Sequence, residues 1–162
     1  MTSKEISEVY GLVLTGGRST RMKQDKSLLC YHQKPQYIHL YEQLKQFLPQ
    51  VYISVRENDT KQLPAIVDTY NIESPLNGIL SAFEYNSRVA WLVVACDMPF
   101  IQDKDMLLLL KQRDHTQVAT TYIGTDGNPH PLFTIYEPAA RDSLLQHAKN
   151  SLSPRDFLLN YP

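Results

Sequence analysis

The chain has 162 residues, of which 43% are hydrophobic and 20% are charged. This length suits about one domain with a sizeable core, and this composition excludes an intrinsically disordered chain. Sixteen basic and seventeen acidic residues leave a formal net charge of −1, which gives no reason to expect nucleic acid or an anionic membrane as a partner. We therefore predict a single domain over residues 1–162.

The sequence carries none of the usual signals of membrane insertion or export. Its longest apolar run, residues 89–96, is far shorter than the roughly 18 residues that a membrane-spanning helix needs. Residues 1–5 contain no apolar stretch typical of a signal peptide. Cys30 and Cys96 are too few for a disulfide framework or a structural zinc site, so we expect buried apolar residues rather than nucleophiles. We predict a cytoplasmic protein with no membrane partner.

Short apolar segments alternate with segments of helical periodicity along the chain. We predict strands over residues 8–14, 50–55, 65–67, 90–95, 117–123 and 131–136. We predict helices that begin at Pro35, Ser74 and Asp103, followed by two more over residues 138–148 and 153–159. This alternation is typical of βαβ units, so we expect an α/β fold: a three-layer α/β/α sandwich around a mainly parallel, Rossmann-like sheet.

The segment after the first predicted strand is suited to binding an anion. Leu14 and Thr15 lead into Gly16 and Gly17, which let a ligand approach backbone N–H groups closely. The next residues include four basic side chains and one acidic side chain: Arg18, Arg21, Lys23 and Lys26, with Asp25. A polyphosphate needs such donors and cations, although the spacing matches neither the Walker A motif nor Gly-x-Gly-x-x-Gly. The alternative interpretation is a solvated basic loop.

A carboxylate follows the most apolar of the predicted strands. Asp97 stands where the apolar run 89–96 ends, and ligands of parallel sheets bind at the carboxyl ends of the strands. A lone charge at that position must reach water, pair or bind a metal ion. Because Mg²⁺ is usually held by one or two carboxylates with substrate phosphates and water, we predict that Asp97 is a Mg²⁺ ligand. The alternative is a helix-capping or turn Asp before Pro99.

Several segments together resemble one enzyme family. Residues 14–26, Leu-Thr-Gly-Gly-Arg-Ser-Thr-Arg-Met-Lys-Gln-Asp-Lys, look like the signature loop of nucleotidyltransferases and most resemble that of the molybdenum cofactor guanylyltransferases. Further matches follow in the family's order: Asp68, Ser74-Pro75-Leu76-x-Gly78, Cys96-Asp97-Met98-Pro99-Phe100 and His130-Pro131-Leu132-Phe133. The resemblance implies a fold of the nucleotidyltransferase type, GTP as the donor, molybdopterin as the phosphorylated acceptor and pyrophosphate as a product.

The resemblance also implies residues that bind the nucleotide. The backbone at Leu14, Thr15, Gly16 and Gly17 is expected to hold the base side and the phosphates of GTP. Asp68 ends a predicted strand and is expected to bind the nucleotide, the alternative being an ordinary loop carboxylate.

Three charged residues are expected to act on the phosphates. By resemblance, Lys26 lies on the α- and β-phosphates and neutralises charge as pyrophosphate leaves; otherwise it is a surface lysine. Arg21 either clamps a phosphate or pairs with Asp25. Asp97 is expected to contact the nucleotide together with Mg²⁺.

The sequence departs from the family pattern at three places. Lys23 stands where members usually have glycine, and Arg56 stands about where guanine-reading members place an asparagine. The sequence stops at Pro162, before the terminal strand and Asn-rich motif of such enzymes, so a partner chain is a candidate to complete that edge. These departures keep two alternatives open: the same chemistry with another base or acceptor, such as CTP or a sugar phosphate, and a non-catalytic nucleotide-binding regulatory protein.

The remaining candidates carry less specific signals. His130 either faces the acceptor or packs beside Pro131. We expect Tyr10, Trp91 and residues 107–110 to belong to the core.

Overall fold

A computed structural model describes residues 6–15 and 33–161. Within these residues, six strands form one sheet in the order β3-β2-β1-β4-β6-β5. The strands are β1 (Val9–Leu14), β2 (Val51–Val55), β3 (Ala65–Val67), β4 (Ala90–Ala95), β5 (Ala119–Ile123) and β6 (Pro129–Tyr136). In this order β1 and β4 are central strands, in keeping with their continuous apolar sequences.

Strand directions decide which residues meet at each end of the sheet. β1 pairs in parallel with β2 and with β4, and β2 pairs in parallel with β3. β6 is antiparallel to both of its neighbours, β4 and β5. The carboxyl ends of β1 to β5 therefore lie together with the start of β6, and we refer to this side as the carboxyl end of the sheet. The opposite side is its amino end.

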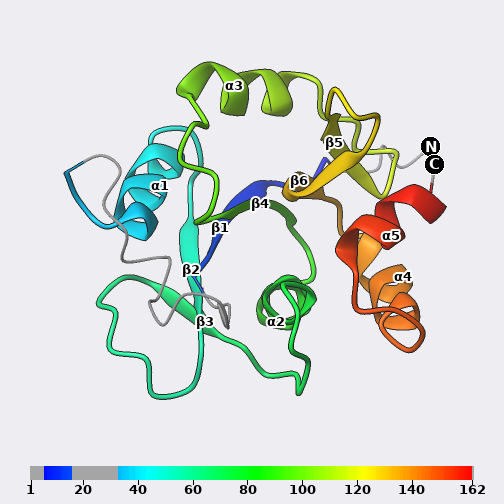
Figure 1. The fold of residues 1–162 in the computed structure, drawn as a ribbon, viewed down its shortest axis with the longest axis horizontal. Helices are drawn as coiled ribbons and strands as arrows, with labels where there is room; N and C mark the ends of the chain where they lie inside the picture. Colours follow the sequence, from blue (N-terminus) through cyan, green and yellow to red (C-terminus); the bar gives the residue numbers. More distant parts are fainter. Residues whose placement is uncertain (1–5, 16–32, 162) are drawn as a thin grey trace.

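Helices cover both faces of the sheet (Figure 1). They are α1 (Gln36–Lys45), α2 (Leu76–Tyr85), α3 (Asp103–Lys111), α4 (Ala140–His147) and α5 (Pro154–Asn160). α1 and α3 pack on one face, and α2, α4 and α5 pack on the other. The predicted three-layer α/β/α sandwich with a mainly parallel sheet is confirmed.

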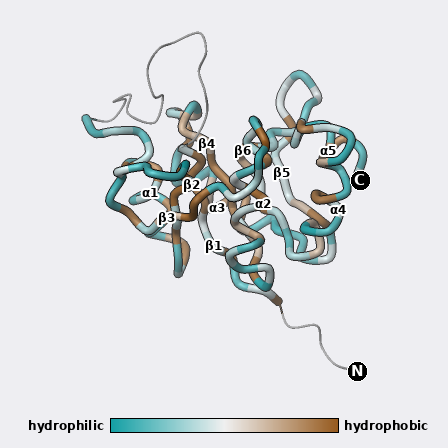
Figure 2. The backbone as a smooth tube through the Cα atoms, turned by 90° about the horizontal axis from the view of Figure 1, so that it is seen from below, coloured by the Kyte–Doolittle hydropathy of each residue, from teal (hydrophilic) through white to brown (hydrophobic). Residues whose placement is uncertain are grey.

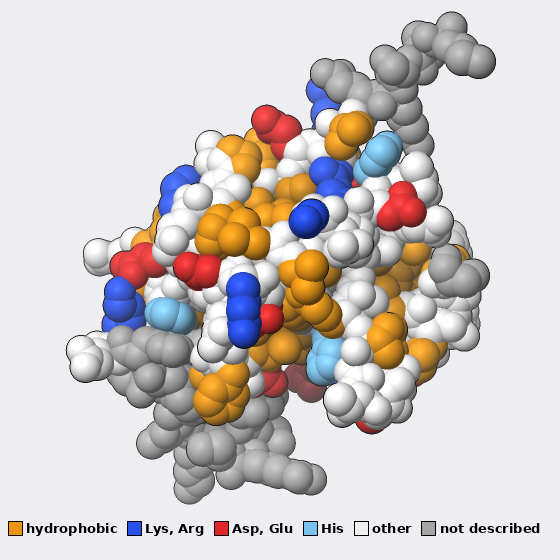
Figure 3. Space-filling view, turned by 90° about the horizontal axis from the view of Figure 1, so that it is seen from above, with side chains coloured by type: hydrophobic (Ala, Val, Ile, Leu, Met, Phe, Trp, Pro, Cys, Tyr) orange, Lys and Arg blue, Asp and Glu red, His pale blue; other side chains and the backbone are white. Residues whose placement is uncertain are grey.

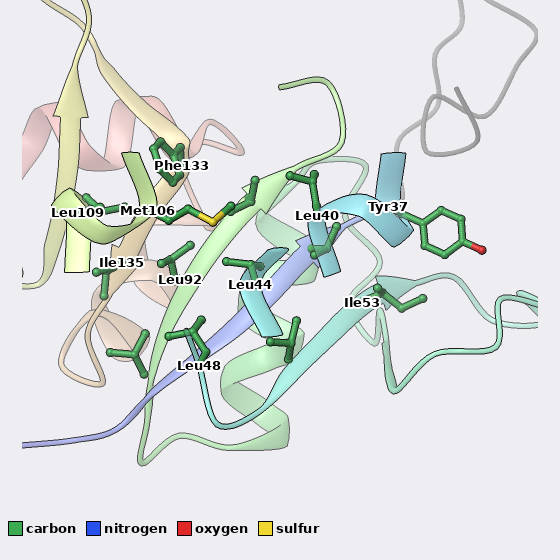
Figure 4. Packing of buried hydrophobic residues seen from close by; sticks show 14 of the residues in the cluster. Tyr37, Leu40, Leu44, Leu48, Ile53, Leu92, Met106, Leu109, Phe133 and Ile135 are labelled. Atoms are coloured by element: carbon green, nitrogen blue, oxygen red, sulfur yellow. The ribbon is translucent and has the colours of Figure 1, made fainter. Parts of the chain in front are cut away.

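The core consists of two apolar clusters separated by the sheet. On one face, Leu40 and Leu44 of α1 and Met106 of α3 pack against the strands (Figure 4). On the other face, buried side chains of α2, α4 and α5 form one cluster with Trp91. Hydrophobic residues accordingly concentrate along the strands, while the outer turns are hydrophilic (Figure 2). Tyr10 is partly buried and packs edge-on against Trp91, so both belong to the core as predicted.

The expectation that residues 107–110 are all core residues is wrong. Leu109 is buried, but Leu107 and Leu108 are 50% and 46% exposed. A helix that covers one face of a sheet turns only part of its circumference inward, and four consecutive residues span more than that part. In Figure 3, which looks onto this side of the molecule, hydrophobic side chains lie at the surface among charged ones.

Element boundaries differ from the predictions by about two residues. β6 begins at Pro129 rather than residue 131, because Pro129 pairs with Ile123. α2 begins at Leu76, and the Ser74 hydroxyl accepts a hydrogen bond from the Leu76 N–H. Among the described residues no helix has the length and apolar character to cross a membrane, and the cytoplasmic location stays a prediction.

A buried ion pair joins three segments at the amino end of the sheet. Arg113, just after α3, donates two hydrogen bonds of 2.7 and 2.8 Å to the two carboxylate oxygens of Glu137. The same guanidinium donates to the backbone oxygen and the hydroxyl of Ser7, at 2.8 and 2.9 Å. Glu137 is only 1% exposed. The start of β1, the end of α3 and the end of β6 are thereby fixed to one another.

Candidate functional site

The carboxyl end of the sheet brings together side chains from distant parts of the chain. The register places Leu14 beside both Ser54 and Ala95, so β1, β2 and β4 end at the same level. Two residues beyond this level, the chain carries Arg56 after β2 and Asp97 after β4, and both are exposed. The parallel ends that the sequence predicted to form one site therefore do converge.

Asp68 is held at this end by β2. The Ser54 hydroxyl donates a hydrogen bond of 2.6 Å to Oδ1 of Asp68, and the Asp68 N–H donates to the Val55 oxygen at 2.8 Å. Ser54 is only 2% exposed, so its hydroxyl has little access to water. Asp68 directly follows β3 as predicted, and one of its carboxylate oxygens is already engaged.

Burial and nearby groups act on the pKa of Asp68 in opposite directions. Burial raises the pKa of the Asp68 carboxyl, and the Ser54 hydrogen bond and the Arg56 charge lower it by less. The Ser54 hydroxyl and the Arg56 charge therefore offset only part of the cost of burying the ionised carboxylate. A ligand that donates a hydrogen bond to the carboxylate would stabilise its charged form.

Close packing of α2 supports this arrangement. A Cβ atom on Gly78 would lie 2.6 Å from the Ser54 hydroxyl and 2.6 Å from a methyl group of Leu14. No side chain fits between these groups, so glycine allows the first turn of α2 to approach β1 and β2.

The chain after Asp68 is also tied to α2. The Thr69 N–H donates to the Ser81 hydroxyl at 2.9 Å, and the Tyr70 N–H donates to the Asn77 side chain at 3.1 Å. The backbone that carries Asp68 is thus fixed from both sides, by β2 and by α2.

The described residues at the end of β1 are buried. Leu14 packs in the α2-side core, and the Thr15 hydroxyl donates to the Ser54 backbone oxygen. The Thr15 N–H also donates to the Ser54 oxygen at 3.4 Å, and the Leu14 oxygen accepts from the Cys96 N–H at 3.3 Å. The predicted nucleotide contacts of this backbone stay a prediction. The other residues predicted to bind the nucleotide after β1 lie outside the described residues: Gly16, Gly17, Arg21 and Lys26. Lys23, which stands where the family usually has glycine, lies outside them as well.

Asp97 emerges from the core as the sequence predicted. Cys96 is buried, as expected, and the next residue, Asp97, is exposed in a turn in which the Met98 N–H donates to the Ala95 oxygen. Among the described residues, no group of three or more His, Cys, Asp or Glu side chains could enclose a metal ion. A single exposed carboxylate fits Mg²⁺, which takes its other ligands from phosphates and water. The Mg²⁺ role of Asp97 stays a prediction.

The sequence alone predicts no role for Ser54, and none for Gly78 beyond its place in the family pattern. A signal for Ser54 was present, because it is the one small polar residue in the otherwise apolar segment of β2. Nothing in the local sequence shows that its hydroxyl meets a carboxylate fourteen positions later.

The chain is similar to known proteins over most of its length. A family model described as "MobA-like NTP transferase domain" matches residues 11–161. A "Molybdenum cofactor biosynthesis bifunctional protein" of Synechocystis sp. is 37% identical over 138 residues, which are 82% of this chain and 40% of that protein. A "Probable molybdenum cofactor guanylyltransferase" of Pelotomaculum thermopropionicum is 34% identical over 86% of this chain and 71% of its own.

A solved structure shares the fold at low sequence identity. The crystal structure of "Molybdopterin-guanine dinucleotide biosynthesis protein A" from Archaeoglobus fulgidus matches with a TM-score of 0.77 at 20% identity. The match covers 94% of this chain and 80% of that one. The chain spans less than half of the Synechocystis relative and 66% of a similar protein of Flavobacterium johnsoniae.

Proposed function

The chain belongs to the MobA-like NTP transferase domain family, and from this premise we propose that it transfers GMP from GTP to the phosphate of molybdopterin, releasing pyrophosphate. The names of the similar proteins support this donor and acceptor. The observation that carries the proposal is the convergence at the carboxyl end of the sheet. There Asp97 is exposed, and Asp68 is held by the buried Ser54.

The proposed reaction is a direct phosphoryl-type transfer. An oxygen of the acceptor phosphate attacks the α-phosphorus of GTP and forms a new P–O bond. The bond from the α-phosphorus to the bridging oxygen breaks, and pyrophosphate leaves with the electron pair. No covalent intermediate with the protein is needed, so the protein positions the reactants and neutralises charge.

The charged residues predicted for the site each have a place in this proposal. Asp68 accepts a hydrogen bond from the nucleoside part of GTP with the carboxylate oxygen that Ser54 does not occupy. Asp97 would hold Mg²⁺, which when bound neutralises charge on the phosphates. The sequence motif alone supports the proposed phosphate contacts of Lys26 and Arg21, and the latter keeps its alternative pairing with Asp25.

Arg56 bears on which base the protein accepts. Arg56 follows β2 and acts electrostatically on Asp68, so it lies on the nucleoside side of the site. A guanidinium only donates hydrogen bonds, whereas an asparagine amide both donates and accepts. CTP therefore remains the alternative donor to test.

The test is a product assay with the complete chain. The protein is mixed with molybdopterin, Mg²⁺ and GTP, ATP, CTP or UTP, and both pyrophosphate and the dinucleotide product are measured. We expect both products in equal amounts with GTP. Binding of GTP without either product, under full substrate supply, would favour the regulatory protein, and products with CTP alone would change the donor.

A further inference from the structure

The start of β6 lies on the opposite side of Asp97 from Arg56 and Asp68. β4 stands between β1 and β6 in the sheet, whereas β2 and β3 lie beyond β1. β6 runs antiparallel to β4 and pairs Phe133 with Val94, so the residues before Phe133 continue past the end of β4. His130 therefore lies at the carboxyl end of the sheet, and it is exposed.

An irregularity of the sheet fixes the backbone of His130. β5 and β6 pair Thr121 with Thr134 and then Ile123 with Pro129, so the register shifts between these two pairs. Such bulges re-aim side chains and are frequent beside active sites. The fully buried Thr134 donates its hydroxyl to the His130 backbone oxygen at 2.6 Å, and the Thr121 hydroxyl lies 3.1 Å from the same oxygen.

A glycine makes room for the imidazole. A Cβ atom on Gly124 would lie 2.8 Å from Nε2 of His130 and 2.8 Å from Oδ1 of Asp126. The imidazole therefore lies against the glycine backbone, beside the Asp126 carboxylate. That carboxylate already accepts two hydrogen bonds of 3.0 Å from Asn128, and the positive charge of Arg155 acts on it.

Packing alone does not account for this arrangement. Pro129 and Pro131 are buried and fill the packing positions on either side, while His130 is exposed. Its main chain is nevertheless held by two hydroxyl groups, and its ring lies in space that a side chain at position 124 would enter. The result is an exposed imidazole on a held main chain, on the side of Asp97 away from the nucleoside.

We propose that His130 contacts the acceptor: its imidazole donates a hydrogen bond to the acceptor phosphate and orients that phosphate toward the α-phosphorus. This inference rests on the proposed function and adds to it the residue that recognises the acceptor. The Asp126 carboxylate accepts both Asn128 hydrogen bonds, and the positive charge of Arg155 acts against its repulsion of a phosphate. Gly124 acts indirectly, by leaving space for the imidazole.

The test separates acceptor recognition from nucleotide binding. His130→Ala is expected to raise the KM for molybdopterin about tenfold, the usual effect of losing one hydrogen bond to a charged group. His130→Asn keeps an N–H donor and should recover part of this loss. Gly124→Ala displaces the imidazole and should raise the same KM. GTP affinity, measured by thermal shift without acceptor, should stay within twofold of the wild type in all three variants.

A second exposed histidine serves as the matched control. His115 follows α3 toward the amino end of the sheet. His115→Ala should leave both the KM for molybdopterin and the GTP affinity unchanged. If the wild type makes the dinucleotide and His130→Ala has an unchanged KM for molybdopterin, this inference is overturned while the proposed function stands. A tenfold loss of GTP affinity in His130→Ala would overturn it too, by placing the residue on the nucleotide side. If the wild type makes no dinucleotide from any donor, the proposed function fails first.

Discussion

The two ends of the sheet use buried polar groups in opposite ways. At the amino end, Arg113, Glu137 and Ser7 satisfy one another, and both carboxylate oxygens of Glu137 are taken. At the carboxyl end, Ser54 engages only one oxygen of Asp68, and Asp97 is open to solvent. The first arrangement fixes the fold, and the protein itself occupies its carboxylate oxygens. The second leaves carboxylate oxygens available to a ligand, which is the physical difference between a structural ion pair and a binding site.

The largest effect on stability is expected from breaking the amino-end ion pair. Glu137→Ala leaves the Arg113 charge buried without its partner, which should lower the free energy of unfolding by about 3–5 kcal/mol. The measurement is urea denaturation followed by circular dichroism. As a matched control, Glu84→Ala removes an exposed partner of Arg141 and should cost less than about 1 kcal/mol. Equal losses in the two variants would remove the distinction between buried and exposed pairs.

A smaller loss of stability, combined with a loss of binding, is expected at Gly78. In Gly78→Ala the new Cβ atom must displace Ser54 or Leu14, which should cost about 1–3 kcal/mol. Because Ser54 holds Asp68, GTP affinity should fall as well. Denaturation and GTP titration of the same preparation check both effects. Ser54→Ala keeps the space and removes only the hydroxyl, so a normal GTP affinity in that variant would contradict the role of the hydrogen bond.

Asp68→Asn should weaken binding without weakening the fold. Burial raises the pKa of Asp68, so the folded state favours the protonated carboxyl. The contribution of the Asp68 carboxyl to stability is complete below the ordinary aspartate pKa of about 3.9. It is lost as the pH rises through the raised pKa of the folded state. The variant should therefore be at least as stable as the wild type at pH 7, and GTP affinity should fall about tenfold.

Denaturation at pH 7 and near pH 3.5, with GTP titration at pH 7, checks this prediction. The stability difference between variant and wild type should shrink at the lower pH, where both side chains are neutral. A variant that is clearly less stable at pH 7 would mean that the Asp68 carboxylate supports the fold, as Glu137 does at the other end.

The smallest effect is expected from Arg56→Ala. Arg56 is exposed, so its removal should leave stability within about 0.5 kcal/mol of the wild type. If the guanidinium faces the base, the ratio of GTP to CTP affinity should change several-fold. Competition titrations with both nucleotides measure this ratio. A strong preference for GTP that survives the substitution would exclude Arg56 as the residue that reads the base.

Local sequence patterns predicted the fold and the strand ends, because both depend on neighbouring residues. The continuous apolar sequences of β1 and β4 are sufficient to place them in the centre of a parallel sheet. Asp68 and Asp97 could likewise be recognised as carboxylates that follow apolar strands. Their roles toward ligands stay predictions, as do those of Lys26 and Arg21.

What the sequence did not predict depends on contacts between distant segments. The hydrogen bond from Ser54 to Asp68 and the approach of Gly78 exist only after β2, β3 and α2 are packed together. The exposure of Leu107 and Leu108 was missed for the same reason, since it depends on which side of α3 meets the sheet.

The central claim, that the carboxyl end of the sheet is a catalytic site, is tested most directly at Asp97. Asp97→Asn keeps the shape of the side chain and removes its charge, and the exposed position should leave thermal stability unchanged. We measure dinucleotide formation from GTP and molybdopterin over a range of Mg²⁺ concentrations, with Asp142→Asn on α4 as the control. The account predicts that Asp97→Asn loses at least about 100-fold in Mg²⁺-dependent turnover, while GTP binding without metal and the control variant stay normal. Full turnover of Asp97→Asn at limiting Mg²⁺ would contradict it.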